Sequence, residues 1–217
     1  MTSPIPSERL ADRLSARTAR AQPSRAEKVL CGLGRLDGAA YRAVAEMSTP
    51  RLDGPLRRMS DFANFSKPWF LVAGGLALFG GPQGRRAALT GVAAIGLTSF
   101  VVNQPLKLAG ARRRPDRTGM GVPESRWVRM PSSTSFPSGH SGSAAAFAVS
   151  VGDVLPTLRL PLRAAAAVVI FSRVYTGVHY PGDVAGGAAI GAVLGRATST
   201  LARRIRRRVR KTSLATG

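Results

Sequence analysis

The sequence predicts an all-α protein: a polytopic bundle of about five to six transmembrane helices, preceded by an amphipathic N-terminal helix. Hydrophobic residues make up 44% of the 217 residues, although Lys and Arg outnumber Asp and Glu by 32 to 11. Long stretches between Pro68 and Gly195 are nearly free of charge, while arginines crowd the gaps and the ends. A nucleic-acid-binding domain would spread its basic residues through helices or alternate them with aromatics. The observed layout is that of a membrane protein, and no nucleic-acid partner is expected.

Composition divides the chain into four regions. The first is basic and rich in Ser and Pro, so we expect it to be flexible or bound to a surface. It has no early apolar run, and no cleavable signal peptide is predicted. A helical lead-in at the interface, a membrane domain and a basic tail follow. The four regions span residues 1–27, 28–66, 67–202 and 203–217.

The lead-in contains a pattern of helical period. Between Lys28 and Met47, apolar residues recur at three- and four-residue spacing, with charged residues between them. This segment is too charged to span a bilayer and suits a helix that lies along the membrane surface. The same pattern fits a helix that packs on the water side of the protein, and periodicity does not separate the two.

Five apolar segments follow, and each is predicted to be a membrane-embedded helix. The second has 20 residues without a charge, about the length that crosses a bilayer. Gly187, Gly191 and Gly195 recur every four residues in the last segment, a spacing that lets helix backbones approach in lipid. A soluble bundle rich in Ala and Gly is the less favoured alternative. The segments span residues 68–81, 87–106, 141–158, 162–180 and 184–201.

Three polar clusters lie at the ends of these segments, where side chains can meet water and a lipid headgroup. They contain both histidines of the chain. No HExxH or CxxC arrangement and no Walker-type loop is present, so neither a metal nor another cofactor is expected. The clusters are Lys107 with Arg114-Pro115, Pro137-Ser138-Gly139-His140, and Ser172-Arg173 with His179 and Asp183.

The residue types in these clusters are those that phosphoryl transfer requires. The transferring group spreads negative charge over its equatorial oxygens, so fixed cations and N–H donors must surround it. Lys107, Arg114 and Arg173 supply the cations. Ser138 and Gly139 precede an Ala-rich segment, so their backbone N–H groups are expected at a helix N-terminus, which binds anions.

A nucleophile and an acid are also required, and the two histidines can fill these roles without a metal. Asp183 follows His179 by four residues. Its carboxylate can accept the hydrogen bond of one ring nitrogen and leave the other nitrogen free to attack. Arg173 falls within one apolar segment and Asp183 immediately precedes another, and charges inside apolar segments are costly and usually functional.

The three clusters resemble the signature of the type 2 phosphatidic acid phosphatase (PAP2) superfamily, which reads KxxxxxxRP, PSGH and SRxxxxxHxxxD. Every fixed position is present, in order and at the family's spacing. The resemblance covers about Pro68 to Leu201. The stretch before it, which includes LDGAAYRAVAEM and SDFANFSKPWF, is similar to the lead-in of bacterial and particularly actinobacterial members.

This resemblance implies a helical bundle with its site at one membrane face and a metal-independent phosphatase activity on lipid phosphates. Polyprenyl phosphates or diphosphates, phosphatidate and phosphatidylglycerophosphate are the substrates of bacterial relatives, and the motifs do not choose among them. The expected partners are therefore a lipid phosphate and membrane lipids. By position, His179 would form a phosphohistidine, Asp183 would orient it and His140 would protonate the leaving oxygen. The phosphate would be held by Lys107, Arg114, Ser138, Gly139 and Arg173.

Two alternatives remain. Vanadate-dependent haloperoxidases carry the same signature with vanadate at the phosphate position, but they are large and soluble, so the membrane segments disfavour that activity. A basic protein that binds membrane surfaces or anionic polymers without catalysis would explain the arginines. The binding of such a protein would weaken steeply with salt. This alternative leaves the spacing of the two histidines unexplained.

The loop of residues 116–136 lies between the first two clusters. Its Arg126, Trp127 and Arg129 could contact the lipid headgroup, but the favoured role is an interfacial one, because Trp and Arg are common at interfaces.

Charge also bears on orientation. The basic tail from Arg203 to Lys211 favours a cytoplasmic C-terminus by the positive-inside rule, which places the catalytic face outside the cell. With five spans, the Arg-rich N-terminal region would share that outer face, which conflicts with the same rule. A sixth, poorly spanning N-terminal segment would remove the conflict.

Overall fold

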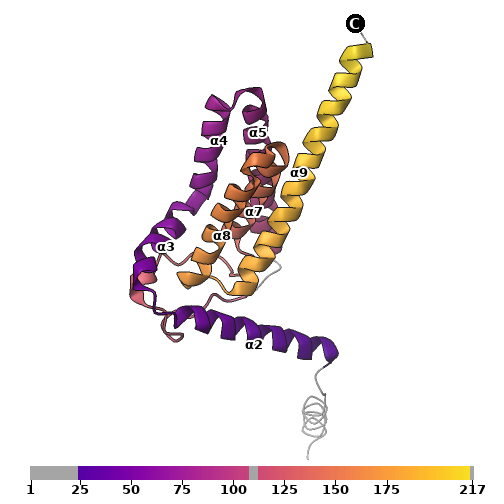
Figure 1. Cartoon of the computed structure of the whole chain (residues 1–217). Helices are drawn as coiled ribbons and strands as arrows, with labels where there is room; N and C mark the ends of the chain where they lie inside the picture. Colours follow the sequence, from indigo (N-terminus) through magenta and orange to yellow (C-terminus); the bar gives the residue numbers. More distant parts are fainter. Residues whose placement is uncertain (1–23, 108–111, 216–217) are drawn as a thin grey trace, which may run out of the picture. The chain divides into compact units, whose positions relative to one another are not determined.

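The computed structural model describes residues 24–107 and 112–215, and within them every regular element is helical. The predicted all-α class is therefore confirmed (Figure 1). Most of the basic region 1–27 lies outside the described residues. The main helices are α2 (Arg25–Ala45), α3 (Pro50–Phe62), α4 (Lys67–Phe79), α5 (Gly81–Val101), α7 (Gly139–Val154), α8 (Arg159–Tyr175) and α9 (Pro181–Ala215). Short turns of helix are η1 (Asn64–Ser66), η2 (Val102–Leu106), η3 (Glu124–Arg126) and η4 (Pro156–Leu158).

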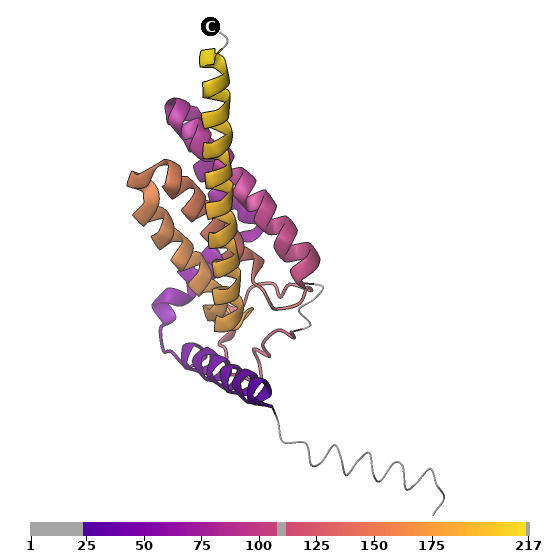
Figure 2. The same cartoon turned by 90° about the vertical axis from the view of Figure 1, so that its right-hand side faces the viewer.

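Each of the five apolar segments contains one long helix, but several boundaries differ from the prediction, and two of the differences have a clear physical reason. Helix α8 ends at Tyr175, before the predicted 180, because Gly177 adopts φ +72° and turns the chain out of the helix, as glycine does at helix C-termini. Helix α9 continues through the basic tail to Ala215, since arginine is a good helix former. Its last turns extend past α7 and α8 (Figure 2).

Helix α7 packs against α5, α8 and α9. The predicted close packing of the three spaced glycines is confirmed at the α7–α9 contact. A Cβ on Gly187, Gly191 or Gly195 would lie only 2.3, 2.0 or 2.5 Å from a backbone oxygen of α7 or its cap. The two backbones therefore touch, and this fixes the start of α7 beside the start of α9.

Large apolar side chains point outward from the helices, while small residues fill much of the interior. Ala144, Ala146 and Ala148 of α7 are buried, whereas Leu78, Phe79, Leu89, Phe100 and Val193 are exposed. One stretch among the described residues, Gly81–Leu106, is both long and apolar enough to cross a membrane. The predicted five to six spans remain a prediction.

Arg126 is neither a headgroup ligand nor an interfacial anchor, so both roles considered for it are wrong. Its side chain is 2% exposed, and its Nε lies 2.9 Å from Oδ1 of Asp53. Its other nitrogens donate to backbone oxygens of Val44, Ala45 and Met47. Its guanidinium also lies 4.2 Å from the ring centre of Tyr175. This buried ion pair ties the loop of residues 116–136 to the lead-in.

Trp127 is held within the same loop, where its Nε1 donates to the oxygen of Val122 at 3.0 Å. Arg129 is exposed, and its role stays open.

Candidate active site

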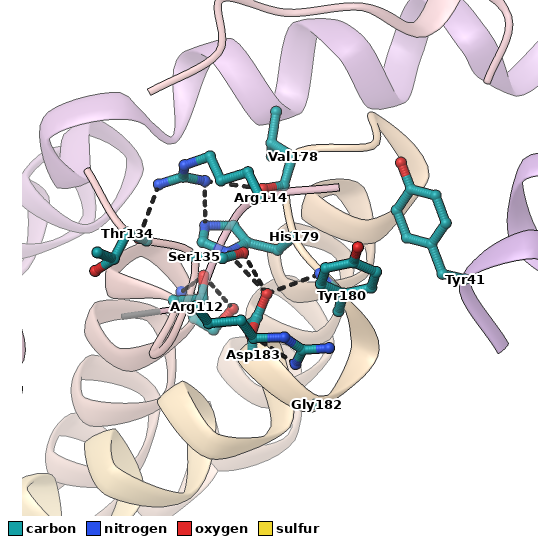
Figure 3. A network of polar contacts seen from close by, with 12 residues as sticks. Tyr41, Arg112, Arg114, Thr134, Ser135, Val178, His179, Tyr180, Gly182 and Asp183 are labelled. Carbon is teal, nitrogen blue, oxygen red and sulfur yellow. Dashed lines mark hydrogen bonds and ion pairs between the residues drawn. The ribbon is translucent and has the colours of Figure 1, made fainter. Parts of the chain in front are cut away.

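The residues of the three polar clusters meet at the end of the bundle where α7 and α9 begin. Arg114 of the first cluster lies beside His179 and Asp183 of the third (Figure 3), and the backbone N–H of Ser138, in the second, donates to the backbone oxygen of Asp183. His179 lies in the short connection between α8 and α9, and its side chain is 2% exposed. Its Nε2 lies 3.2 Å from Nη1 of Arg114. Its Nδ1 lies 3.6 Å from Oδ2 of Asp183 and 3.5 Å from Oγ of Ser135. The ring is therefore held between a carboxylate and a guanidinium.

Asp183 occupies the first turn of α9 and is fully buried. Its Oδ2 accepts a hydrogen bond from the backbone N–H of Tyr180 at 2.9 Å and another from the hydroxyl of Ser135. Its Oδ1 accepts from Nη1 of Arg112 at 3.0 Å. A carboxylate with these donors stays ionised and can hold the Nδ1–H of His179.

Ser135 and Arg112 were missed in the sequence, since neither is a fixed position of a cluster. Arg112 bridges two carboxylates, because its Nη2 lies 2.6 Å from Oδ2 of Asp37, and its guanidinium lies 4.1 Å from the ring centre of Tyr180. Their nearness to the clusters was the only available signal. Loop residues have no periodicity that tells which way a side chain points.

Two of the predicted phosphate-binding cations meet at Ser133. Lys107 donates from Nζ to Oγ of Ser133 at 3.0 Å. Arg114 donates from Nε to the backbone oxygen of Ser133 and from Nη1 to that of Val178, both at 2.8 Å. These bonds fix the guanidinium of Arg114 beside His179.

The third cation, Arg173, is 1% exposed. Its Nη1 donates to the backbone oxygen of Ser60 at 3.0 Å and to the Ser60 hydroxyl at 2.6 Å. Its Nε is buried and has no hydrogen-bond partner among the described residues. A buried donor without an acceptor is costly, so this N–H is suited to an anion that enters the site.

The first turn of α7 offers fewer free donors than the sequence suggests. The backbone N–H of Ser138 donates to the backbone oxygen of Asp183 at 3.0 Å, so it is not available to an anion, which corrects the expected use of that group. The Ser138 hydroxyl caps α7 instead. Gly139 follows at the first position of the helix, where backbone N–H groups have no partner within the helix. His140 lies in the same turn, with its Nε2 2.9 Å from Oδ1 of Asn64.

Burial lowers the pKa of His179 to about 4, and the neighbouring Arg114 and Arg173 act in the same direction, against the Asp183 carboxylate. The imidazole is therefore neutral at pH 7. A neutral ring with its Nδ1–H toward Asp183 has a free electron pair on Nε2, which is the state that a nucleophile needs. Among the described residues, no three His, Cys, Asp or Glu side chains form a group that could hold a metal.

This pKa predicts how acid affects stability. An unfolded histidine takes up its proton near pH 6.5, whereas folded His179 does so only near pH 4. Between these values the unfolded state binds more protons, so the unfolding free energy must fall as the pH drops from 6.5 toward 4. The contribution of His179 is roughly 3 kcal/mol. Unfolding midpoints measured in detergent between pH 4 and 7.5 should fall less steeply for His179→Gln than for the native protein, and parallel curves would contradict the neutral histidine.

Comparison with protein families matches residues 87–207 to the PAP2 superfamily. The chain is similar to the decaprenylphosphoryl-5-phosphoribose phosphatase of Mycobacterium tuberculosis, with 32% identity over 149 residues that cover 66% of this chain and 76% of the relative. The protein of the same name from Mycolicibacterium smegmatis is 34% identical over 138 residues, which cover 60% of this chain and 68% of the relative.

Solved structures give a consistent result. The transmembrane PAP2-type phosphatidylglycerolphosphate phosphatase of Bacillus subtilis superposes with a TM-score of 0.62 and 25% identity, over 80% of this chain and 88% of the other. Aquifex aeolicus LpxE superposes with a TM-score of 0.52 and 22% identity, over 74% of this chain and 92% of the other. This second comparison shows that the two proteins share a fold.

Proposed function

Because the chain belongs to the PAP2 superfamily, we propose that it is a membrane-embedded lipid phosphate phosphatase that works through a phosphohistidine on His179. The observation that carries this proposal is the neutral, buried ring of His179 between Asp183 and Arg114. Such a ring has one nitrogen committed to a carboxylate and the other directed at a cation that can hold a phosphoryl group.

The phosphate group would be bound by Lys107, Arg114, Arg173 and the start of α7. The unpartnered Nε of Arg173 supports this assignment, because a phosphoryl oxygen would supply the acceptor that this buried N–H lacks. Arg114 now contacts Nε2 of His179. With substrate bound, the same guanidinium can contact a phosphoryl oxygen and hold phosphorus in front of that nitrogen.

In the first step, Nε2 of His179 attacks phosphorus, and the bond from phosphorus to the lipid oxygen breaks. His140 gives a proton to that oxygen as it leaves. In the second step, water attacks the phosphohistidine, His140 takes the proton of the water, and the N–P bond breaks. Asp183 stabilises the positive charge that develops on the His179 ring. No step requires a metal.

The distribution of apolar side chains supports a membrane location. Large apolar side chains are exposed on three of the helices, namely Phe79, Leu89, Phe100 and Val193. Exposed apolar surface of this kind marks a site of contact with membrane lipid or another protein. Asp183 lies in the first turn of α9, and the basic stretch lies near the other end of the same helix. The positive-inside rule would therefore place the basic tail in the cytoplasm and the site on the outer side of the membrane.

The lipid itself is proposed from the relatives. The mycobacterial proteins are named for a phosphorylated pentose on a polyprenyl phosphate, and the Bacillus subtilis protein is named for a glycerophospholipid phosphate. The proposed substrate is therefore a phosphate ester or diphosphate on a polyprenyl or glycerolipid anchor. Its phosphate would bind the polar site, and its lipid chain would lie along the apolar helices.

The proposal is tested by phosphate release from the detergent-purified protein, without added metal and with excess EDTA. The panel holds polyprenyl diphosphate, polyprenyl monophosphate, phosphatidate and phosphatidylglycerophosphate. We expect EDTA-resistant release from at least one lipid, and the fastest substrate identifies the lipid class. Absence of release from every lipid, or release that EDTA abolishes, would overturn the proposed mechanism.

A further inference from the structure

A residue outside the three clusters contacts His140. Oδ1 of Asn64, in the η1 turn, lies 2.9 Å from Nε2 of His140. A side-chain carbonyl oxygen only accepts hydrogen bonds, so Nε2 must carry the hydrogen. In the neutral ring, Nδ1 is therefore the nitrogen with the free electron pair. This single contact selects one tautomer of His140.

The turn that presents Asn64 is strained. Phe65 and Ser66 both adopt left-handed backbone conformations, with φ of 56° and 58°, although neither is a glycine. This conformation is unfavourable for residues other than glycine, and such strain clusters at functional sites. The side chain of Phe65 is 86% exposed, so burial of its ring does not offset the cost. Burial of the Phe65 side chain therefore does not account for the strained turn.

The segment just before this turn supports a second residue of the site. Ser60, in α3, accepts two hydrogen bonds from Arg173. Ser60 and Asn64 both precede the family match, which begins at residue 87. A segment outside that match therefore holds one proposed phosphate ligand and the proposed acid.

We propose that Asn64 is a positioning residue that fixes the ring of His140, so that Nδ1 exchanges the proton with the leaving oxygen and with water. This inference rests on the proposed function. When His140 acts as the acid, the ring enters the step as the imidazolium, with a proton on each nitrogen. Nε2–H stays on Asn64, Nδ1–H passes to the lipid oxygen as its bond to phosphorus breaks, and the ring is left neutral. In the hydrolytic step Nδ1 takes the proton from water, and the N–P bond breaks.

The leaving group provides the first test. Asn64→Ala frees the ring of His140, so kcat/KM for a lipid phosphate should fall about 100-fold, the lower range of general acid catalysis. An aryl phosphate such as 4-nitrophenyl phosphate has a leaving group that hardly needs protonation, and its kcat/KM should fall by less than about 10-fold. Equal losses on the two substrates would show that Asn64 is merely structural. Asn64→Asp keeps an acceptor oxygen and should recover most of the activity on the lipid.

A double-mutant cycle provides the second test. If Asn64 acts through His140, then Asn64→Ala should cost almost nothing more once His140→Ala is present. Additive losses in the double variant would overturn the proposal. Gln83→Ala is the matched control, because it also removes a side-chain amide. Gln83 is exposed in the first turn of α5, at the end of that helix opposite to Lys107, so its loss should leave kcat/KM unchanged.

The result separates this inference from the proposed function. If the native protein releases no phosphate, the function fails. If it is active and Asn64→Ala behaves like Gln83→Ala, only the role of Asn64 fails.

Discussion

Replacement of His179 by alanine is expected to reduce lipid phosphate turnover by about 10⁴-fold or more, since loss of a nucleophile removes the reaction path and not merely binding energy. Rapid acid-free quenching with ³²P-labelled lipid should trap a labelled native protein, and the variant should stay unlabelled. A phosphohistidine is the species that this experiment detects.

Two controls make the result specific. Gln83→Ala changes an exposed residue at the start of α5 and should keep full turnover. The thermal midpoint of His179→Ala should show that the variant is folded. Turnover above about one-tenth of native in a folded variant would exclude His179 as the nucleophile.

Replacement of Gly191 by leucine should have the largest effect on stability. A Cβ at this position would lie 2.0 Å from the backbone oxygen of Gly142, and a helix backbone cannot yield as a flexible side chain can. Overpacking alone costs about 1–3 kcal/mol, and separation of α9 from α7 would add to it. The same movement would draw Asp183 away from Ser138 and His140, so turnover should fall together with stability.

Gly96→Leu is the matched control for that change. Gly96 lies within α5, and apart from its chain neighbours and the nearby backbone of its own helix, no atom of the described residues lies within 4 Å of its added Cβ. Both variants place leucine in a helix, so helix propensity affects them equally. Thermal unfolding in detergent should show a much lower midpoint for Gly191→Leu alone. Similar midpoints would mean that the α7–α9 contact is not the constraint that holds the bundle.

The sequence was informative where a property depends on spacing along the chain. Apolar runs located the helices of the bundle, and the four-residue glycine repeat located the face on which α9 meets α7. The motif spacing brought His179, Asp183 and Arg114 to the same end of the bundle. These features depend on local periodicity and on the alternation of helix direction, which the order of residues determines.

Properties that depend on distant partners could not be predicted. Arg126 was expected at the membrane interface because its local composition resembles an interface, but its partner Asp53 lies in α3. Asn64 gave no signal, because its importance depends on a turn that packs beside α7. The Ser138 N–H was expected to be free, and it is used by a backbone oxygen of α9.

The ion pair of Asp53 and Arg126 also constrains how this protein can change during evolution. A buried arginine that loses its carboxylate partner is strongly destabilising, by about 3–5 kcal/mol, which is a large part of the stability of a typical protein. Neither residue can therefore be replaced alone without a compensating change. We therefore expect that an exchange of the lead-in or of the 116–136 loop between relatives would have to carry both Asp53 and Arg126.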